Sequence, residues 1–120
     1  MRAVVQRVNA ASVAVDGKLV SSIGQGLLVF LGVSKEDTEA EAKRISAKIA
    51  GLRIFCDENR KMNRSLKDIG GSILLISNFT LYGNTRHGFR PEFLRSAGAA
   101  VAEPLYEYVY KLLNEQVPTK

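Results

Sequence analysis

The run Leu27-Leu28-Val29-Phe30-Leu31-Gly32-Val33 has no charged or strongly polar side chain at any position. An apolar run of this length without alternation is typical of a strand that is buried on both faces. Upstream of it, residues 12–15 alternate between polar and apolar side chains, and Asp16-Gly17 supplies a hairpin turn before residues 18–20. The first third of the chain is therefore predicted to form a sheet that contains a fully buried strand.

A first helix is predicted to begin near Thr38, because Thr38-x-x-Glu41 has the form of a capping box. An apolar stripe follows at helical spacing: Ala42, Ile45, Ile49 and Leu52. A second helix is predicted to open near Pro104, since proline is favoured in the first turn of a helix.

Between the two helices, residues 53–56 are predicted to form a short strand and residues 72–81 a long one. No linker or internal repeat divides the chain, so residues 1–120 are predicted to form one domain. The elements together predict an α+β fold: a curved, mostly antiparallel sheet or small β-barrel-like core, with two helices packed outside.

The composition is that of an ordinary globular protein, with 46% hydrophobic and 24% charged residues. No apolar run is long enough for a membrane span, and the N-terminus has no apolar core of signal-peptide length, so we expect a cytoplasmic protein. The single cysteine, Cys56, and the single histidine, His87, exclude an internal disulfide, a thiolate zinc cluster and a His-rich metal site. We therefore expect no metal and no cofactor, and a Cys56 that is buried and inert.

The formal charge is +5, and the basic excess is concentrated in residues 53–95. The basic residues of this segment are Arg53, Arg60, Lys61, Arg64, Lys67, Arg86, Arg90 and Arg95. Its acidic residues are Asp57, Glu58, Asp68 and Glu92. A cationic surface of this kind attracts polyanions such as nucleic acid, although a mildly basic surface without any such partner has the same composition.

Common catalytic motifs are absent. Gly83-x-x-x-x-Gly88 resembles half a phosphate-binding loop, but Phe89-Arg90 follows where Lys and Ser or Thr are required. There is no Gly-x-Ser-x-Gly nucleophile elbow, and nothing singles out partners for His87 in a triad.

The candidate site is the point where the apolar strand 73–76 turns abruptly polar. Backbone N–H groups at such a strand end can stabilise a developing negative charge, Ser77 and Thr80 supply hydroxyls, and Arg86 and Arg90 supply charge for phosphate. The alternative is a strand with an ordinary polar end, in which Thr80 is present only for its β propensity.

The stretch Ser77-Asn78-Phe79-Thr80-Leu81 resembles the Ser-Gln-Phe-Thr-Leu signature of the D-aminoacyl-tRNA deacylases, with Asn78 in place of Gln. Four further segments are similar to that family in the same order along the chain: residues 1–8, 27–34, 53–63 and 82–93. The resemblance spans the whole chain and implies that family's fold.

The resemblance implies hydrolysis of the ester of D-aminoacyl-tRNA, with release of the free D-amino acid and tRNA. It implies that the backbone N–H groups of Phe79 and Thr80 contact the oxyanion, while Ser77 and Asn78 shape the strand end. The Thr80 hydroxyl either attacks or orients the ester, and we favour orientation because no general base is visible beside it. The residues expected to contact substrate or tRNA are Arg7, Arg86, Phe89 and Arg90.

In that family a Gly-Pro element from the partner subunit of a homodimer rejects L-amino acids, and Arg7 is expected to help fix it. The sequence ends at Lys120 without this element. We therefore expect a deacylase-like domain that lacks the final strand and the Gly-Pro element and has weakened rejection of L-esters or no activity. The alternative functions are a non-catalytic RNA-binding or tRNA-binding relative and an esterase for a small molecule.

Overall fold

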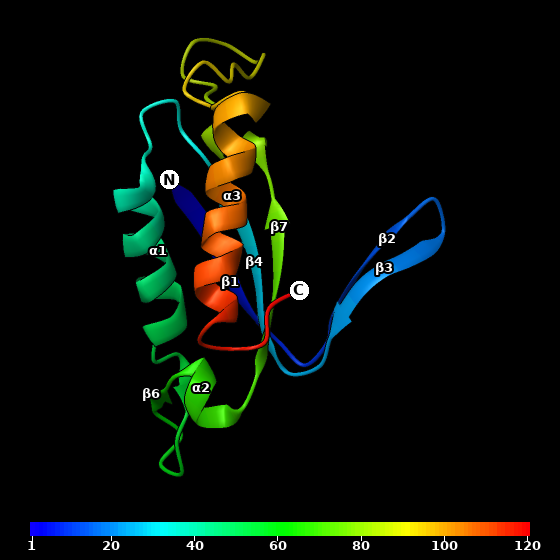
Figure 1. The fold of residues 1–120 in the computed structure, drawn as a ribbon, viewed down its shortest axis with the longest axis vertical. Helices are drawn as coiled ribbons and strands as arrows, with labels where there is room; N and C mark the ends of the chain where they lie inside the picture. The colour runs from blue at the N-terminus through cyan, green and yellow to red at the C-terminus, as the bar shows by residue number, and fades with distance from the viewer.

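A three-stranded sheet with the order β1-β4-β7 forms the centre of the computed structural model, which describes residues 1–120 (Figure 1). The strands are β1 (Arg2–Val8), β2 (Ala11–Val15), β3 (Lys18–Ile23), β4 (Gly26–Gly32), β5 (Phe55–Cys56), β6 (Met62–Arg64) and β7 (Ser72–Ser77). The helices are α1 (Glu39–Gly51), α2 (Leu66–Ile69), α3 (Ala99–Asn114) and the 3₁₀ helix η1 (Phe79–Tyr82). None of these helices combines the length and the hydropathy that crossing a bilayer requires.

Strand β4 lies between β1, to which it is antiparallel, and β7, to which it is parallel. Five of its seven residues are buried, but Leu28 and Phe30 are only partly buried, so the predicted strand is confirmed and its predicted burial on both faces is not. Gly26 permits the close approach of β7, because a Cβ atom there would lie 1.8 Å from the Ser72 carbonyl oxygen. The register places Leu31 opposite both Ala3 of β1 and Ser77 of β7, so these residues mark the end of the sheet at which β7 stops.

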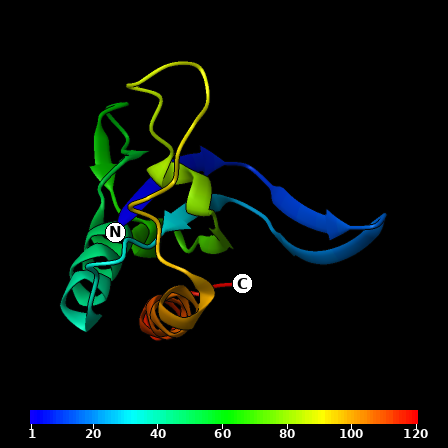
Figure 2. The same ribbon diagram turned by 90° about the horizontal axis from the view of Figure 1, so that it is seen from above.

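Helices α1 and α3 pack together and cover one face of the sheet, whereas the other face has no α-helix and is met only by η1 at the Gly32 end of β4 (Figure 2). Alternate sheet residues join these helices in the main core: Leu27, Val29, Leu31, Ile73, Leu75, Ala42, Ile49, Leu105, Val109 and Leu113. On the uncovered face, Val4, Phe30 and Ile76 form a row across the three strands. Val4 is 50% exposed. The sheet is therefore apolar on both faces and covered by helices on only one.

The α+β class is confirmed, with two corrections. The central sheet does not close on itself, so the barrel-like alternative is wrong, and there are three α-helices where two were predicted. The unpredicted helix, α2, is a single turn held by a capping box between Ser65 and Asp68 and ended by Gly70 in the left-handed conformation. It has too few residues to produce a helical apolar stripe.

The observed starts of the two long helices can be compared with the starts predicted from the sequence. Thr38 is the N-cap of α1 and both bonds of its capping box are present, which confirms the predicted start. Helix α3 instead begins at Ala99, with Pro104 inside it. The prediction failed because the actual N-cap, Gly98, has no side chain to signal the helix start, and the alanine-rich first turn is strongly helix-forming.

Strands β2 and β3 form a hairpin that projects from the body of the protein (Figures 1 and 2). The predicted turn is confirmed, because Asp16 and Gly17 have φ angles of 51° and 78°, the left-handed pair that suits a two-residue hairpin. Two apolar side chains of β3, Leu19 and Val20, are exposed on this hairpin.

Residues 118–120 lie along the edge of β7 that does not face β4. The Ile73 N–H donates to the Pro118 carbonyl oxygen at 2.9 Å, and the Leu75 N–H donates to the Lys120 carbonyl oxygen at 2.9 Å. The Lys120 N–H returns a bond of 2.8 Å to the Ile73 carbonyl oxygen. This segment therefore extends the sheet beyond β7 as far as Leu75.

The cap of α1 predicts an acid-sensitive contribution to stability. Hydrogen bonds from the side chain and backbone of Thr38 lower the pKa of Glu41 from 4.5 to about 2. Because the pKa in the folded state is the lower one, this stabilisation is present above pH 4.5 and is lost as the pH falls towards 2. We expect Thr38→Ala to cost about 1 kcal/mol in the free energy of unfolding at pH 7, and less at pH 2.

Chemical denaturation at both pH values measures this effect, with Thr38→Ser as the control that keeps the cap. A Thr38→Ala variant as stable as the parent at pH 7 would contradict the assigned cap.

Candidate active site

The candidate site lies where β7 ends and the chain turns into η1. The Asn78 N–H donates to the Leu31 carbonyl oxygen at 2.8 Å, which is the last bond between β7 and β4. Asn78 is extended (φ −148°, ψ 99°) and is the N-cap of η1. The polar end of the strand is therefore a short helical turn, in which the first N–H groups have no partner within the helix.

The backbone N–H groups of this turn differ in what they bind. The Thr80 N–H donates to Oδ1 of Asn78 at 3.0 Å, and the Leu81 N–H points to the Asn78 carbonyl oxygen at 3.4 Å. The Phe79 N–H has no acceptor within the chain. Of the two N–H groups expected to contact an oxyanion, the one at Phe79 is free and the one at Thr80 is bonded to a side chain.

The Thr80 hydroxyl also donates to Oδ1 of Asn78. An amide oxygen has no useful basicity at neutral pH, so this bond orients the hydroxyl without activating it as a nucleophile. Asn78 thus accepts hydrogen bonds from both the backbone N–H and the hydroxyl of Thr80. Asn commonly accepts from the backbone N–H two residues later in a turn.

Ser77 and Phe79 line a cavity of about 430 Å³ between the end of β7 and helix α3. The other residues that line it are Ala97, Ala99, Ala102, Glu103, Tyr106 and Glu107. The Phe79 ring is exposed and packs edge-on against Phe93, with ring centroids 5.2 Å apart. The cavity is fixed on its far side by α3, because the Tyr106 hydroxyl donates to the Leu75 carbonyl oxygen at 2.8 Å.

The basic loop that follows η1 is closed by two backbone bonds. The N–H groups of Asn84 and Glu92 each donate to the carbonyl oxygen of the other at 2.9 Å. Three of the expected tRNA contacts, Arg86, Phe89 and Arg90, are all exposed on this loop, and Phe89 is 103% exposed. The loop projects from the body next to the site (Figure 2).

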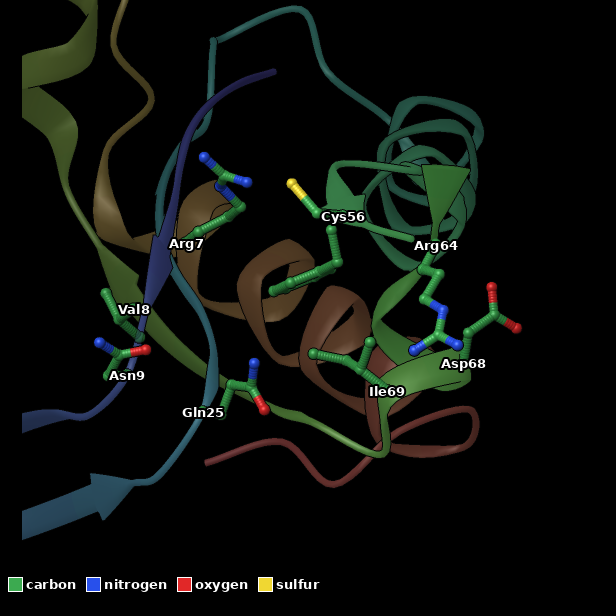
Figure 3. A pocket seen from close by; sticks show the side chains of 9 residues that line it. Arg7, Val8, Asn9, Gln25, Cys56, Arg64, Asp68 and Ile69 are labelled. Carbon is green, nitrogen blue, oxygen red and sulfur yellow. The ribbon is translucent and has the colours of Figure 1, made fainter. Parts of the chain in front are cut away.

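Arg7 is not brought to this turn within one chain. It lies opposite Leu27, four residues along β1 from Ala3, which corresponds to about 13 Å of strand. Its Nη1 donates to the Ile54 carbonyl oxygen at 3.0 Å. It lines a separate cavity of about 680 Å³ together with Cys56 (Figure 3).

The expected burial of Cys56 is wrong. Its side chain is exposed in the cavity that Arg7 lines, and Figure 3 shows its sulfur pointing towards the Arg7 side of that cavity. The residue follows the buried Phe55 in a two-residue strand, and alternation turns it outward. No group of three or more His, Cys, Asp or Glu side chains is placed to hold a metal ion.

Two residues near η1 were not predicted from the sequence. Arg2 donates from Nη1 to the Leu81 carbonyl oxygen at 3.0 Å, and its Cζ lies 4.5 Å from the centroid of the Tyr82 ring. Tyr82 is buried, and burial raises the pKa of its hydroxyl above the usual value. The resemblance of residues 1–8 to the family indicated that this strand is important. The sequence did not show which arginine of β1 contacts η1.

A family model described as D-Tyr-tRNA(Tyr) deacylase matches residues 4–120. A D-aminoacyl-tRNA deacylase of Clostridium botulinum (strain 657 / Type Ba4) is 53% identical over 117 residues, which cover 98% of this chain and 78% of that protein. The chain belongs to the D-aminoacyl-tRNA deacylase family. A D-aminoacyl-tRNA deacylase of Roseiflexus castenholzii (strain DSM 13941 / HLO8) is 56% identical over 107 residues, which cover 89% of this chain and 68% of that protein.

Two solved structures resemble this deacylase. The structure named "c-Myc DNA Unwinding Element Binding Protein" has a TM-score of 0.91 and 38% identity, covering 99% of this chain and 83% of that one. A probable eukaryotic D-amino acid tRNA deacylase has a TM-score of 0.79 at 17% identity, covering 95% of this chain and 67% of that one. The second likeness shows the fold alone. The expected family and its ester-hydrolase class are thus confirmed.

Proposed function

We propose that this deacylase hydrolyses D-aminoacyl-tRNA at the turn formed by residues 77–80, with the Phe79 N–H as the oxyanion donor. Hydrolysis of this ester is the activity expected of the family. The observation that supports the location is the unpartnered Phe79 N–H, which belongs to a residue lining a cavity at the end of β7. A free N–H at the start of a helical turn suits an anion.

In the proposed reaction, the oxygen of a water molecule bonds to the ester carbonyl carbon, and the carbonyl oxygen becomes negative. The Phe79 N–H donates to that oxygen, which is worth on the order of a hundredfold or more in rate. The bond from carbon to the ribose oxygen then breaks, and the proton released by the water passes to the ribose oxygen. The products are the free D-amino acid and tRNA.

We propose that Ser77 and Asn78 shape this turn and that Thr80 orients the ester. Because its hydroxyl donates to an amide oxygen, we expect Thr80→Ala to retain deacylation within about tenfold of the parent rate, the scale of one neutral hydrogen bond. Single-turnover hydrolysis of D-tyrosyl-tRNA measures this, with Thr80→Ser as the control. Complete loss of hydrolysis in a folded Thr80→Ala variant would instead indicate a covalent intermediate on the hydroxyl.

The loop from Asn84 to Glu92 is proposed to hold the acceptor end of the tRNA through Arg86, Phe89 and Arg90. Two arginines and a fully exposed aromatic ring on one short loop suit phosphates and an unstacked base. We place the reaction in the cytoplasm, where aminoacylated tRNA is used in translation.

The direct test of the proposed function compares release of amino acid from D-tyrosyl-tRNA and from L-tyrosyl-tRNA. Faster release of the D-amino acid supports a deacylase that edits chirality. Binding of tRNA without hydrolysis of either ester would indicate the non-catalytic relative, and hydrolysis of small esters alone would indicate a small-molecule esterase.

We also propose that the protein is a homodimer that buries the uncovered face of its sheet. The row formed by Val4, Phe30 and Ile76 is apolar, and a two-fold axis would place the same row of a second copy against it. Light scattering is expected to give twice the chain mass of 13.2 kDa.

Val4→Glu is expected to reduce that mass to one chain, while Val101→Glu on α3 serves as the matched exposed control. A parent protein that scatters as a single chain would contradict the dimer.

A further inference from the structure

A small cationic hollow lies beside the C-terminal end of η1. Its volume is about 180 Å³, and it is lined by Arg2, Tyr82, Gly83, Asn84, Arg86 and Arg95. Three of these six residues are arginines and none is acidic. The guanidinium groups come from three separate parts of the chain: the start of β1, the basic loop, and the segment before α3.

The Tyr82 ring contacts two of these arginines. The Cζ atoms of Arg2 and Arg95 lie 4.5 Å and 5.5 Å from the centroid of its ring, which is the range of a cation–π contact. Arg2 is also tied to the Leu81 carbonyl oxygen at 3.0 Å. The Tyr82 hydroxyl is neutral at physiological pH, as in any ordinary tyrosine, and burial raises its pKa further, so it adds no counter-charge.

None of the three arginines has a carboxylate partner. The two ion pairs of the chain join the N-terminal ammonium group to Asp37 and Arg64 to Glu58. The Asp37 carboxylate is already engaged, since it also accepts the Ser34 N–H at 2.7 Å. The Glu92 carboxylate accepts the Leu94 N–H at 2.9 Å. Like charges that converge without a counter-ion repel one another, and an anion between them would remove that repulsion.

We infer that this hollow binds the 5′ phosphate of the nucleotide whose ribose carries the amino acid, an assignment that rests on the proposed function. Guanidinium groups present paired N–H donors that match phosphate oxygens. From Phe79 to Tyr82 the chain advances three residues of a 3₁₀ helix, or about 6 Å. The ester and this phosphate are attached to the same ribose, so both fit one nucleotide lying along η1.

The test compares equilibrium binding of adenosine 5′-monophosphate, adenosine and inorganic phosphate to the parent protein and to Arg95→Gln. The Arg95 side chain is exposed and makes no hydrogen bond, so its loss removes only the contact with the Tyr82 ring. Arg86→Gln is the second variant, and Arg44→Gln on α1 is the control that removes the same charge from an exposed position away from the hollow.

We expect the parent and Arg44→Gln to bind the monophosphate about tenfold more tightly than adenosine, the scale of one charge-assisted bond. In Arg95→Gln and Arg86→Gln that preference is expected to fall below about twofold, with adenosine affinity unchanged. Equal affinities in the parent protein, or a preference that survives both substitutions, would overturn the inference.

Inorganic phosphate that binds as tightly as the monophosphate would assign the hollow to free phosphate and overturn the nucleotide assignment. Hydrolysis of D-tyrosyl-tRNA is measured in parallel to separate the two claims. Normal hydrolysis by a parent protein that shows no preference for the monophosphate defeats only this inference. A clear preference without hydrolysis defeats only the proposed function.

Discussion

Phe79→Pro is expected to lower kcat for D-tyrosyl-tRNA by about 10² to 10³, the effect of losing one oxyanion donor. Proline has no N–H, so the substitution removes the one free donor of the turn. The backbone can accept it, because Phe79 is the first residue of η1, where proline is tolerated, and Asn78 before it is extended. The expected loss is therefore in catalysis and not in folding.

The matched control is Phe79→Ala, which removes the same aromatic ring and its packing against Phe93 but keeps the N–H. Single-turnover rates at saturating enzyme measure both variants, and thermal unfolding verifies that both are folded. If the alanine and proline variants lose the same amount of activity, the ring rather than the N–H is what the site needs.

Phe89→Ala is expected to weaken tRNA binding by about tenfold to a hundredfold, since stacking of one base on an aromatic ring is worth roughly 1–3 kcal/mol. The ring is 103% exposed and packs on nothing in the chain, so its removal cannot act through the fold. Fluorescence anisotropy with uncharged tRNA at fixed salt measures the affinity.

Phe89→Tyr keeps a stacking face and is expected to bind as the parent does. Val20→Ala, which trims another exposed apolar side chain on the β2–β3 hairpin, is the second control. An alanine variant at position 89 with unchanged affinity would remove this ring from the tRNA-binding surface.

The sequence predicted the central strand and the start of α1 because both carry strong local signals. A continuous apolar run predicts a central strand, and the Thr38–Glu41 pair forms a capping box that depends only on neighbouring residues. The start of α3 was missed because Gly98 caps it without a side-chain bond and Pro104 is a misleading signal inside it. The sequence therefore predicted the features that neighbouring residues determine, and it failed where no neighbouring side chain marks the start of the helix.

Which arginine of β1 lies beside η1 could not be predicted from the sequence, for a different reason. Arg2 and Arg7 lie on one strand, but the pairing with β4 places Arg2 opposite Gly32, beside η1, and Arg7 opposite Leu27 at the far end. That register depends on contacts between segments distant in the chain. The engagement of the Thr80 N–H by Asn78 was likewise not predicted, although Asn two residues before a donor is a known turn signal.

The most direct test of the oxyanion assignment replaces the peptide N–H of residue 79 with an ester oxygen, by incorporating the α-hydroxy analogue of phenylalanine. This change keeps the ring and the backbone path. The same replacement at Leu81, whose N–H makes only a long contact of 3.4 Å to the Asn78 carbonyl oxygen, is the control. We expect the single-turnover rate to fall by about a hundredfold at position 79 and to change little at position 81. An unchanged rate with the ester at position 79 would contradict the role assigned to the Phe79 N–H.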